Sequence, residues 1–369
     1  MARGKITRAN LRAAVMRPKR GRRKKIAPVP ELSEADFEFL LMFVANLRGD
    51  LLKGFLKDHD LPVSGPKLAI AKRLKDAIDE GKLAYGALID LLDEVEPWGK
   101  QHVYLMTGPE QPGSWIDADW VGTHLLEHGV AEHLNAPKPL LLPPVLELAS
   151  IIWSPDALRV TSIERRTGLV RDEDRDDEDE TEDGDEVHYR AYVQRTTRGM
   201  IIFDWDFASN TAFLQITQLP SQDDYESAQA RFYNLVGAWL PLHTFAIQDL
   251  RKAIVEFRRL NKAQQGNVRS HAVELADPDG RRVTGTSASA EQPLPGNQTL
   301  DTGMDNFINA GAVGHSGNFY FTSGPGSAIE PTKEMHFTLM GTRNRLNIMT
   351  PQSEPTIRYA IQRVRDACA

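Results

Sequence analysis

The spacing of apolar residues changes near residue 150, and this change limits the folds that the chain can adopt. Before it, apolar residues recur every three or four positions, as at Phe37, Leu40 and Val44, which is the period of an amphipathic helix. From about residue 155 they fall in short alternating runs such as 212–216, which is the period of a β-strand. The pattern therefore predicts a helical part followed by a part built on a sheet.

Local signals place the individual elements of each part. In the first part a helix is expected to begin after the N-cap Ser33, because an acid and helically spaced apolar residues follow it. Further helices are expected at 47–59, 66–80, 84–95 and, in shorter pieces, within 117–133. In the second part strands are expected at 158–163, 189–193, 200–207, 212–216, 271–275, 281–286, 319–322, 335–340 and 345–349. Helices are expected there at 223–240, 247–261 and 355–367, with a loop at 287–303.

The chain has 369 residues, more than one hydrophobic core usually serves, so several units are expected. We predict a disordered basic tail at 1–30, a helical domain at 31–150, an α+β domain at 151–265 and a β-rich continuation with a C-terminal helix at 266–369. The predicted fold class is multidomain, with an all-α N-terminal region followed by an α+β region of mostly antiparallel strands.

The net charge of −7 conceals two segments of opposite sign. Residues 1–30 carry eleven Lys or Arg and no acid, and such a tail is typical of a phosphate-binding arm. Its densest cations are Lys19, Arg20, Arg22, Arg23, Lys24 and Lys25. Residues 172–186 carry twelve Asp or Glu against one Arg, and we expect a disordered acidic loop there because so many like charges cannot pack.

The segment 47–83 reads as a helix, a tight turn and a second helix. Leu52 and Leu56 lie one turn apart on the first helix, and the turn follows as Leu61-Pro62-Val63-Ser64-Gly65-Pro66-Lys67. Ser64 is a plausible N-cap for the second helix, and Pro66 suits its first turn, where a missing N–H costs nothing. We expect an apolar stripe that includes Leu68, Ala71 and Leu74, with Ile70 and Ile78 beside it.

This pattern resembles the SAP family of small helical DNA-binding modules, whose Leu-Pro-x-Ser-Gly-x-Lys turn precedes a leucine-rich helix. The resemblance covers about 35 residues, and 61–74 carry it most closely. It implies binding to duplex DNA, often AT-rich. The positions that match the binding residues of the family are Ser64, Gly65, Lys67, Lys72 and Arg73.

A physical argument supports the same residues without the family. A helix N-terminus offers free N–H groups and partial positive charge to phosphate, and nearby lysines add affinity through counterion release. Such contacts position a protein on DNA without reading its bases. The chain departs from the family at Asp60, where the family carries glycine, and Asp58 adds a second acid. We therefore expect DNA affinity to depend on the module acting together with the basic tail.

Other residues leave further functions open. His124, Glu127 and His128 match the H-x-x-E-H pattern of some zinc hydrolases, and Asp204 with Asp206 could bind Mg²⁺ as in nucleases. Neither pattern has a convincing further ligand nearby, so we predict no metal, no cofactor and no catalytic residue. A second basic group on the helix expected at 247–262 could form another DNA surface or a solvated helix face. It consists of Arg251, Lys252, Arg258, Arg259 and Lys262.

The location and the partners follow from composition. The single cysteine, Cys368, excludes an intramolecular disulfide, no apolar run is long enough to cross a bilayer, and the basic N-terminus lacks the apolar segment of a secretory signal. We expect an intracellular protein, in the cytoplasm or nucleoid of a bacterium or in a eukaryotic nucleus. The layout is distantly similar to that of the CENP-N kinetochore family, on the strength of the segment 88–105, read as a helix ending in Trp98 and Tyr104.

The leading prediction is a non-enzymatic DNA-associated protein that binds the duplex backbone with little sequence specificity. A protein-binding adaptor, with the partner on the α+β region or the acidic loop, is one alternative. A metal-dependent nuclease or hydrolase is the other.

Overall fold

A computed structural model describes residues 34–45, 47, 49–109, 113–138, 140–180, 186–220, 224–330 and 333–369. The basic segment 1–30 lies outside these residues. The predicted phosphate-binding residues Lys19, Arg20, Arg22, Arg23, Lys24 and Lys25 are therefore not placed.

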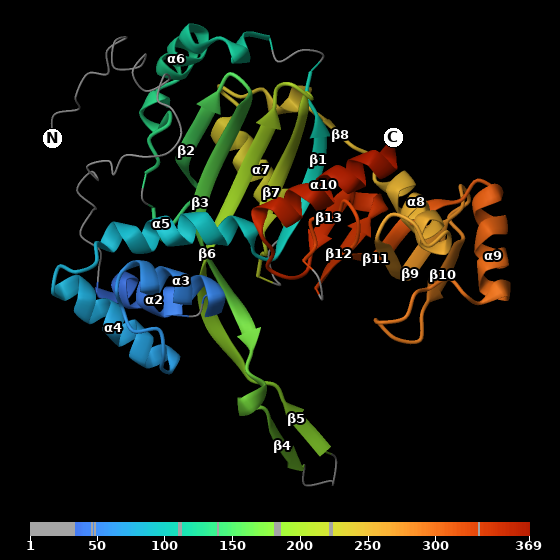
Figure 1. Cartoon of the computed structure of the whole chain (residues 1–369), viewed down its shortest axis with the longest axis horizontal. Helices are drawn as coiled ribbons and strands as arrows, with labels where there is room; N and C mark the ends of the chain where they lie inside the picture. The colour runs from blue at the N-terminus through green and yellow to red at the C-terminus, as the bar shows by residue number, and fades with distance from the viewer. Residues whose placement is uncertain are drawn as a thin grey trace.

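Four helices at the start of the described chain pack into one compact unit, which we call the helical cluster (Figure 1). They are α2 (Glu34–Ala45), α3 (Gly49–Asp58), α4 (Lys67–Asp79) and α5 (Tyr85–Val95), close to the predicted positions. Their shared core is apolar and includes Leu40, Leu56, Leu74 and Leu88, all fully buried. The helical period of the sequence therefore identified these elements and their buried face.

The rest of the described chain is built on one eleven-stranded sheet in which every pair of neighbouring strands is antiparallel. Its strand order is β10-β9-β11-β12-β13-β1-β7-β6-β3-β2, with β8 paired to β1. The strands are β1 (Gln101–Thr107), β2 (Glu147–Ser154), β3 (Ala157–Arg171), β6 (Tyr192–Asp206), β7 (Thr211–Thr217), β8 (Ala246–Ile247), β9 (Val268–Ala276), β10 (Arg282–Thr286), β11 (Val313–Thr322), β12 (Glu334–Met340) and β13 (Arg345–Ile348).

The predicted fold class is wrong, because the described residues include no separate all-α N-terminal region. Strand β1 belongs to the segment 31–150 that was expected to be helical, yet it lies in the middle of the sheet between β13 and β7. The fold is mixed throughout, with nine α-helices among the described residues and one large antiparallel sheet. The run 101–107 is too short and too apolar for its period to distinguish a strand from a buried helix.

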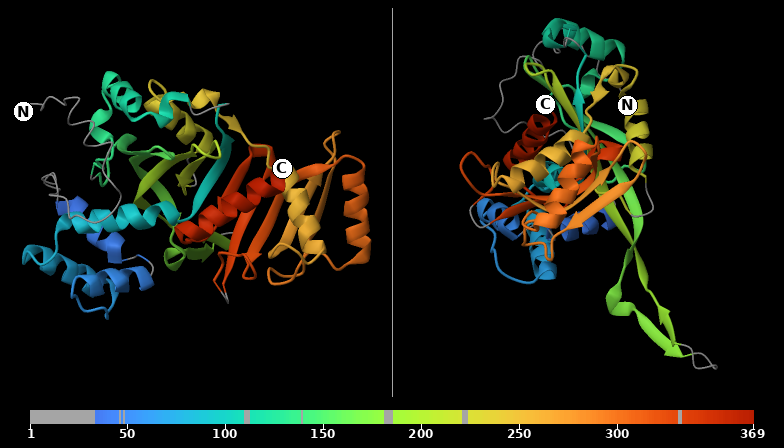
Figure 2. Two further views of the ribbon diagram at one scale, coloured as in Figure 1. Left: turned by 45° about the horizontal axis from the view of Figure 1, so that its top comes forward. Right: turned by 90° about the vertical axis from the view of Figure 1, so that its right-hand side faces the viewer.

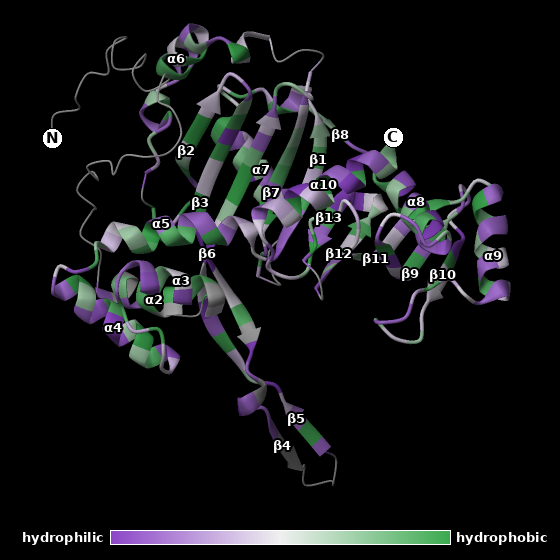
Figure 3. Ribbon diagram, in the orientation of Figure 1, coloured by the Kyte–Doolittle hydropathy of each residue, from purple (hydrophilic) through white to green (hydrophobic). Residues whose placement is uncertain are grey.

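Helices cover different faces of the two halves of this sheet (Figure 1). The helices are α6 (Ala118–Glu127) and α7 (Tyr225–Val236) on one core, and α8 (Arg251–Lys262), α9 (Gln298–Asn309) and α10 (Glu354–Cys368) on the other. Alternate side chains of β1 divide between the two cores, with Tyr104 and Met106 in the first and Val103 and Leu105 in the second. In Figure 3 the hydrophobic colour gathers in middle strands such as β7, whereas α9 is largely hydrophilic.

Short 3₁₀ turns connect several of these elements. They are η1 (Glu96–Trp98), η2 (Gly113–Ile116), η3 (Ala131–His133), η4 (Glu173–Arg175), η5 (Leu242–Thr244) and η6 (Gly341–Arg343). Helix α9 begins within the segment 287–303 that was expected to be a loop, and Asn297 caps it by accepting a hydrogen bond from the backbone N–H of Leu300. None of the helices among the described residues is both long and apolar enough to cross a lipid bilayer.

Strands β3 and β6 continue beyond the sheet as a projecting hairpin, which we call the arm (Figure 2). The two strands pair along their whole length, from Ala157 opposite Asp206 to Arg171 opposite Tyr192. Most of the acidic segment 172–186 lies at the tip, where β4 (Asp177–Glu180) pairs with β5 (Glu186–Tyr189). The described part of this segment thus contains the 3₁₀ turn η4 (Glu173–Arg175) and strand β4, where a disordered loop was expected.

Candidate nucleic-acid interface

The turn that follows α3 has the hydrogen bonds of a Schellman motif. The N–H of Leu61 donates to the carbonyl of Leu56 at 2.8 Å, and the N–H of Asp60 donates to that of Lys57 at 3.0 Å. Asp60 occupies the left-handed position of the motif, with φ of 56°. Glycine is usual at this position because it has no Cβ to clash. The geometry explains why glycine suits the position at which the SAP-like pattern and this chain differ.

The N-terminus of α4 has no side-chain cap. The residue at the cap position is Pro66, and Ser64, the predicted N-cap, makes no capping hydrogen bond to the helix. Gly65 precedes it with φ of 126°, a conformation that other residues rarely adopt. The first-turn N–H groups have no acceptor within an α-helix, so this end of α4 can donate hydrogen bonds to an outside group.

The predicted DNA-binding residues divide between two roles. Arg73 is used within the module, because its guanidinium donates to the carbonyls of Pro62 and Ser64, the latter at 3.0 Å. It braces the turn, and its side chain is only partly exposed. Lys67 and Lys72 are exposed, as are Ser64 and Gly65. The structure therefore places four of the five predicted residues on the surface around the start of α4.

The apolar stripe of α4 is narrower than the sequence predicted. Leu68 was expected within it, but its side chain is 72% exposed. The buried face consists of Ile70, Ala71, Leu74 and Ala77. An exposed leucine beside Lys67 and Lys72 gives this surface an apolar contact in addition to its cations.

Charge is distributed along α4 in the reverse of the order that stabilises a helix. The first turn carries no acid and the last turn no base, whereas acids favour the N-terminus and bases the C-terminus. Lys67 and Lys72 lie in the N-terminal half, while Asp76, Asp79 and Glu80 lie toward the other end. An anion bound at the N-terminus would remove the electrostatic cost of this arrangement.

A buried arginine holds the helical cluster against the sheet. Arg198 of β6 has a fully buried side chain and donates to Asp93 of α5 at 2.6 Å, to Glu96 of η1, and to the carbonyl of Leu140 at 2.8 Å. Burial raises the pKa of Glu96 to about 7, although Arg198 acts in the opposite direction. One cation and two carboxylates therefore join the end of α5 and η1 to β6.

The candidate metal ligands make contacts within the protein. A ring nitrogen of His124 lies 2.7 Å from the carbonyl of Trp239, and one of His128 lies 2.8 Å from the carbonyl of His124. Asp204 accepts hydrogen bonds from Arg159 at 2.8 Å and Arg358 at 3.1 Å. Asp206 accepts hydrogen bonds from the backbone N–H and the hydroxyl of Ser209. Within the described part of the chain, no group of three or more metal-ligating side chains is gathered.

The basic group on α8 is largely neutralised by neighbouring acids. Arg258, expected on the outer face, is 2% exposed and donates to Asp301 and Asp305. The other pairs are Arg251 with Asp249, Arg259 with Glu256 and Lys262 with Asp305. This helix is therefore a weaker candidate for a nucleic-acid surface than α4.

Neither a protein-family model nor a curated protein sequence matches this chain.

Proposed function

We propose that this protein binds the phosphate backbone of duplex DNA through the N-terminal half of α4, with little preference for base sequence. The observation that carries the proposal is the reversed charge of an uncapped helix. First-turn N–H groups, Lys67 and Lys72 lie at one exposed end, and the first turn of the helix contains no acid. A phosphate group at a helix N-terminus receives hydrogen bonds and interacts favourably with the helix dipole.

The module offers a small binding surface, so we expect other cations of the chain to contribute. Asp58 and Asp60 are exposed at the end of α3 and weaken the positive potential of the module. The segment 1–30 supplies eleven further Lys or Arg. Each phosphate that a cation neutralises adds affinity by counterion release, which makes the binding strongly dependent on salt.

The test is a titration of a fluorescent 20-base-pair duplex with full-length protein at several salt concentrations between about 50 and 200 mM. Lys67→Gln and Lys72→Gln should each weaken binding, and each should lower the slope of log affinity against log salt by about 0.9. Lys82→Gln is the matched control, because Lys82 lies beyond the opposite end of α4 and pairs with Glu80 at 2.6 Å. It should leave affinity and slope nearly unchanged.

A variant with Gln at the six cations from Lys19 to Lys25 measures the contribution of the N-terminal segment. We expect it to weaken binding more than either α4 variant, with a correspondingly larger loss of slope. Duplex binding that is the same in wild type, Lys67→Gln and Lys72→Gln would refute the role of α4. If no duplex binding occurs at low salt, the proposal fails, and the exposed Leu68 becomes the starting point for a search for protein partners.

A further inference from the structure

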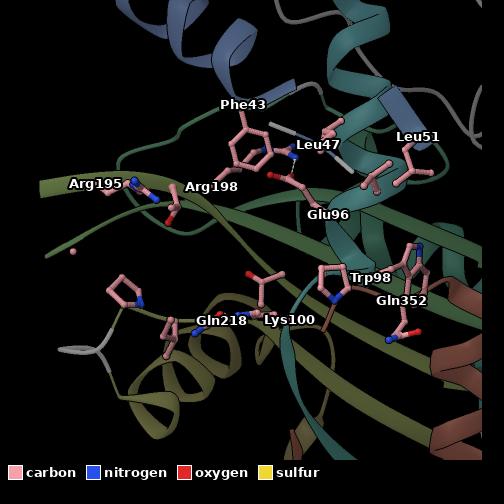
Figure 4. Close-up of a pocket in the computed structure, with 18 of the residues that line it drawn as sticks. Phe43, Leu47, Leu51, Glu96, Trp98, Lys100, Arg195, Arg198, Gln218 and Gln352 are labelled. Atoms are coloured by element: carbon pink, nitrogen blue, oxygen red, sulfur yellow. Dashed lines mark hydrogen bonds and ion pairs between the residues drawn. The ribbon is translucent and has the colours of Figure 1, made fainter. Parts of the chain in front are cut away.

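A cavity of about 630 Å³ lies between the helical cluster, the root of the arm and the start of β1 (Figure 4). Phe43, Leu47 and Leu51 form one side, and Trp98 with Lys100 lies across from them. Its volume falls in the range of about 300–1,000 Å³ that is usual for small-molecule sites. It is separate from the exposed end of α4, since no residue of that helix lines it.

The rim of the cavity is positively charged. Lys100 and Arg195 line it and are exposed, and neither has a carboxylate partner among the described residues. The other charged groups in the lining, Arg198 and Glu96, form a buried ion pair with each other. An occupant with a negative group would therefore be attracted to Lys100 and Arg195.

The wall contains a hydrogen-bond acceptor without a partner. Glu96 has a side chain only 7% exposed, and one of its carboxylate oxygens accepts from Arg198. Its other oxygen, Oε1, is buried and accepts no hydrogen bond from any described residue. A buried acceptor left unpaired costs about 1–3 kcal/mol, so a donor group that reached Oε1 after a turn of the Glu96 side chain would be favoured.

We propose that this cavity binds a single nucleotide. Lys100 and Arg195 would hold its phosphate at the rim, Trp98 would contact the face of its base, and Glu96 would accept a hydrogen bond from an amino group of the base. Carboxylates recognise the amino group of cytosine in this way, and aromatic side chains stack on any base. A free nucleotide and an unpaired nucleotide within a strand share this chemistry.

An acidic peptide with apolar side chains is the competing occupant, and the lining favours the nucleotide over it. The lining of the cavity combines two planar rings, Phe43 and Trp98, with the exposed amide of Gln218 and the two cations. A base has a flat face for the rings and donors for Glu96. A peptide carboxylate has no hydrogen-bond donor to offer the unpaired oxygen of Glu96.

The experiment uses full-length protein and four probes: deoxycytidine monophosphate, thymidine monophosphate, a ten-base single strand of deoxycytidine, and an acidic peptide. Affinities are measured by calorimetry for the free nucleotides and by fluorescence anisotropy for labelled strand and peptide. We expect binding of deoxycytidine monophosphate, the strand or both, and tighter binding of deoxycytidine than of thymidine monophosphate, which lacks the amino group. Lys100→Gln and Arg195→Gln should each weaken binding roughly tenfold, the usual effect of losing a charged hydrogen bond.

Lys252→Gln is the matched control, because Lys252 is an exposed cation of α8 outside the cavity. It should leave the affinity unchanged. For the strand, each cavity variant should also lower the salt slope by about 0.7, the value for single-stranded nucleic acid. Binding of the strand but not of the free nucleotides would assign the site to nucleic acid, and the converse would assign it to a metabolite.

Three results would overturn the proposal. The first is no binding of either nucleotide or of the strand, and the second is binding that Lys100→Gln and Arg195→Gln leave unchanged. The third is an acidic peptide that binds more tightly than the nucleotides and competes with them for the cavity. The outcome is independent of the duplex experiment. Lys72→Gln should weaken duplex binding and leave nucleotide binding unchanged. Arg195→Gln should weaken nucleotide binding and leave duplex binding unchanged.

Discussion

Replacing Arg198 with methionine tests the contact that joins the helical cluster to the sheet. Methionine has an apolar side chain of similar length, so the substitution removes the charge and hydrogen bonds while leaving little empty space. Asp93 and Glu96 would then be left near the same buried position without their shared cation. Breaking a buried ion pair by removing one partner costs about 3–5 kcal/mol, and we expect an effect of this size near pH 8.

The cost should depend on pH, because Glu96 can take up a proton. Its pKa is about 7 in the folded protein against an ordinary value of 4.5, so folding favours the protonated form. The contribution of Glu96 to the free energy of unfolding is fully present below pH 4.5 and is lost as the pH rises toward 7. Without Arg198 the folded pKa rises further, so the variant should keep losing about 1.4 kcal/mol per pH unit above 7 while the wild type does not.

Urea unfolding followed by circular dichroism at pH 6 and pH 8 measures both effects. Arg195→Met is the control, since Arg195 lies three positions away on the same strand and is exposed, and it should change stability by less than about 0.5 kcal/mol. A cost for Arg198→Met below about 1 kcal/mol at pH 8, or an equal cost at both pH values, would refute the reasoning.

Three further predictions concern single positions. Asp60→Gly should stabilise the protein by about 0.5 kcal/mol in urea unfolding. Glycine relieves the backbone strain of a left-handed residue, and this gain is partly offset by the greater freedom of the unfolded chain. A loss of stability would contradict this prediction. Burial lowers the pKa of His102 to about 3, so between pH 6.5 and 3 only the unfolded state takes up the proton, and the free energy of unfolding falls as the pH is lowered. His102→Asn should weaken this pH dependence, and an identical pH profile would argue against it. Gly168→Ala would place a Cβ 2.3 Å from a carbon of Pro220 and should lower the free energy of unfolding by about 1–3 kcal/mol. Gly303→Ala, in an open helical position, should raise it by about 0.5–1 kcal/mol in the same assay. Equal effects of the two substitutions would contradict the packing argument.

The helical cluster could be predicted because its signals are local. Leu52 and Leu56 lie four positions apart in α3, and Ile70 and Leu74 do so in α4, so each pair falls on one face of its helix whatever surrounds it. The exposure of Leu68 could not be read in the same way, because the period places it near the stripe and only the packing of α4 determines whether another element covers it. The strands after residue 155 were also largely identified by their alternation, among them β7 and β12.

The central strand of the sheet was missed for a related reason. The residues of β1 were read together with the helix that precedes them, yet they pair with Thr211–Thr217 and with Leu346–Ile348. These partners lie more than a hundred positions away, and nothing near β1 in the sequence indicates them. Pairing over such distances is decided by the closure of long loops and by the burial of both faces, which are properties of the whole fold.

The sequence by itself thus determined the periods of the elements, the segregation of charge, and the helix, turn and helix of the SAP-like pattern. Each of these depends on residues within a few positions of one another. The tertiary structure alone decided which charges remain available. Arg73 is used by its own turn and Arg198 by Asp93 and Glu96. Lys100, just before β1, and Arg195 of β6 are distant in the sequence and line one cavity. An ion pair or a cavity is formed by groups that are close in space, and proximity in space is set by packing that no local pattern encodes.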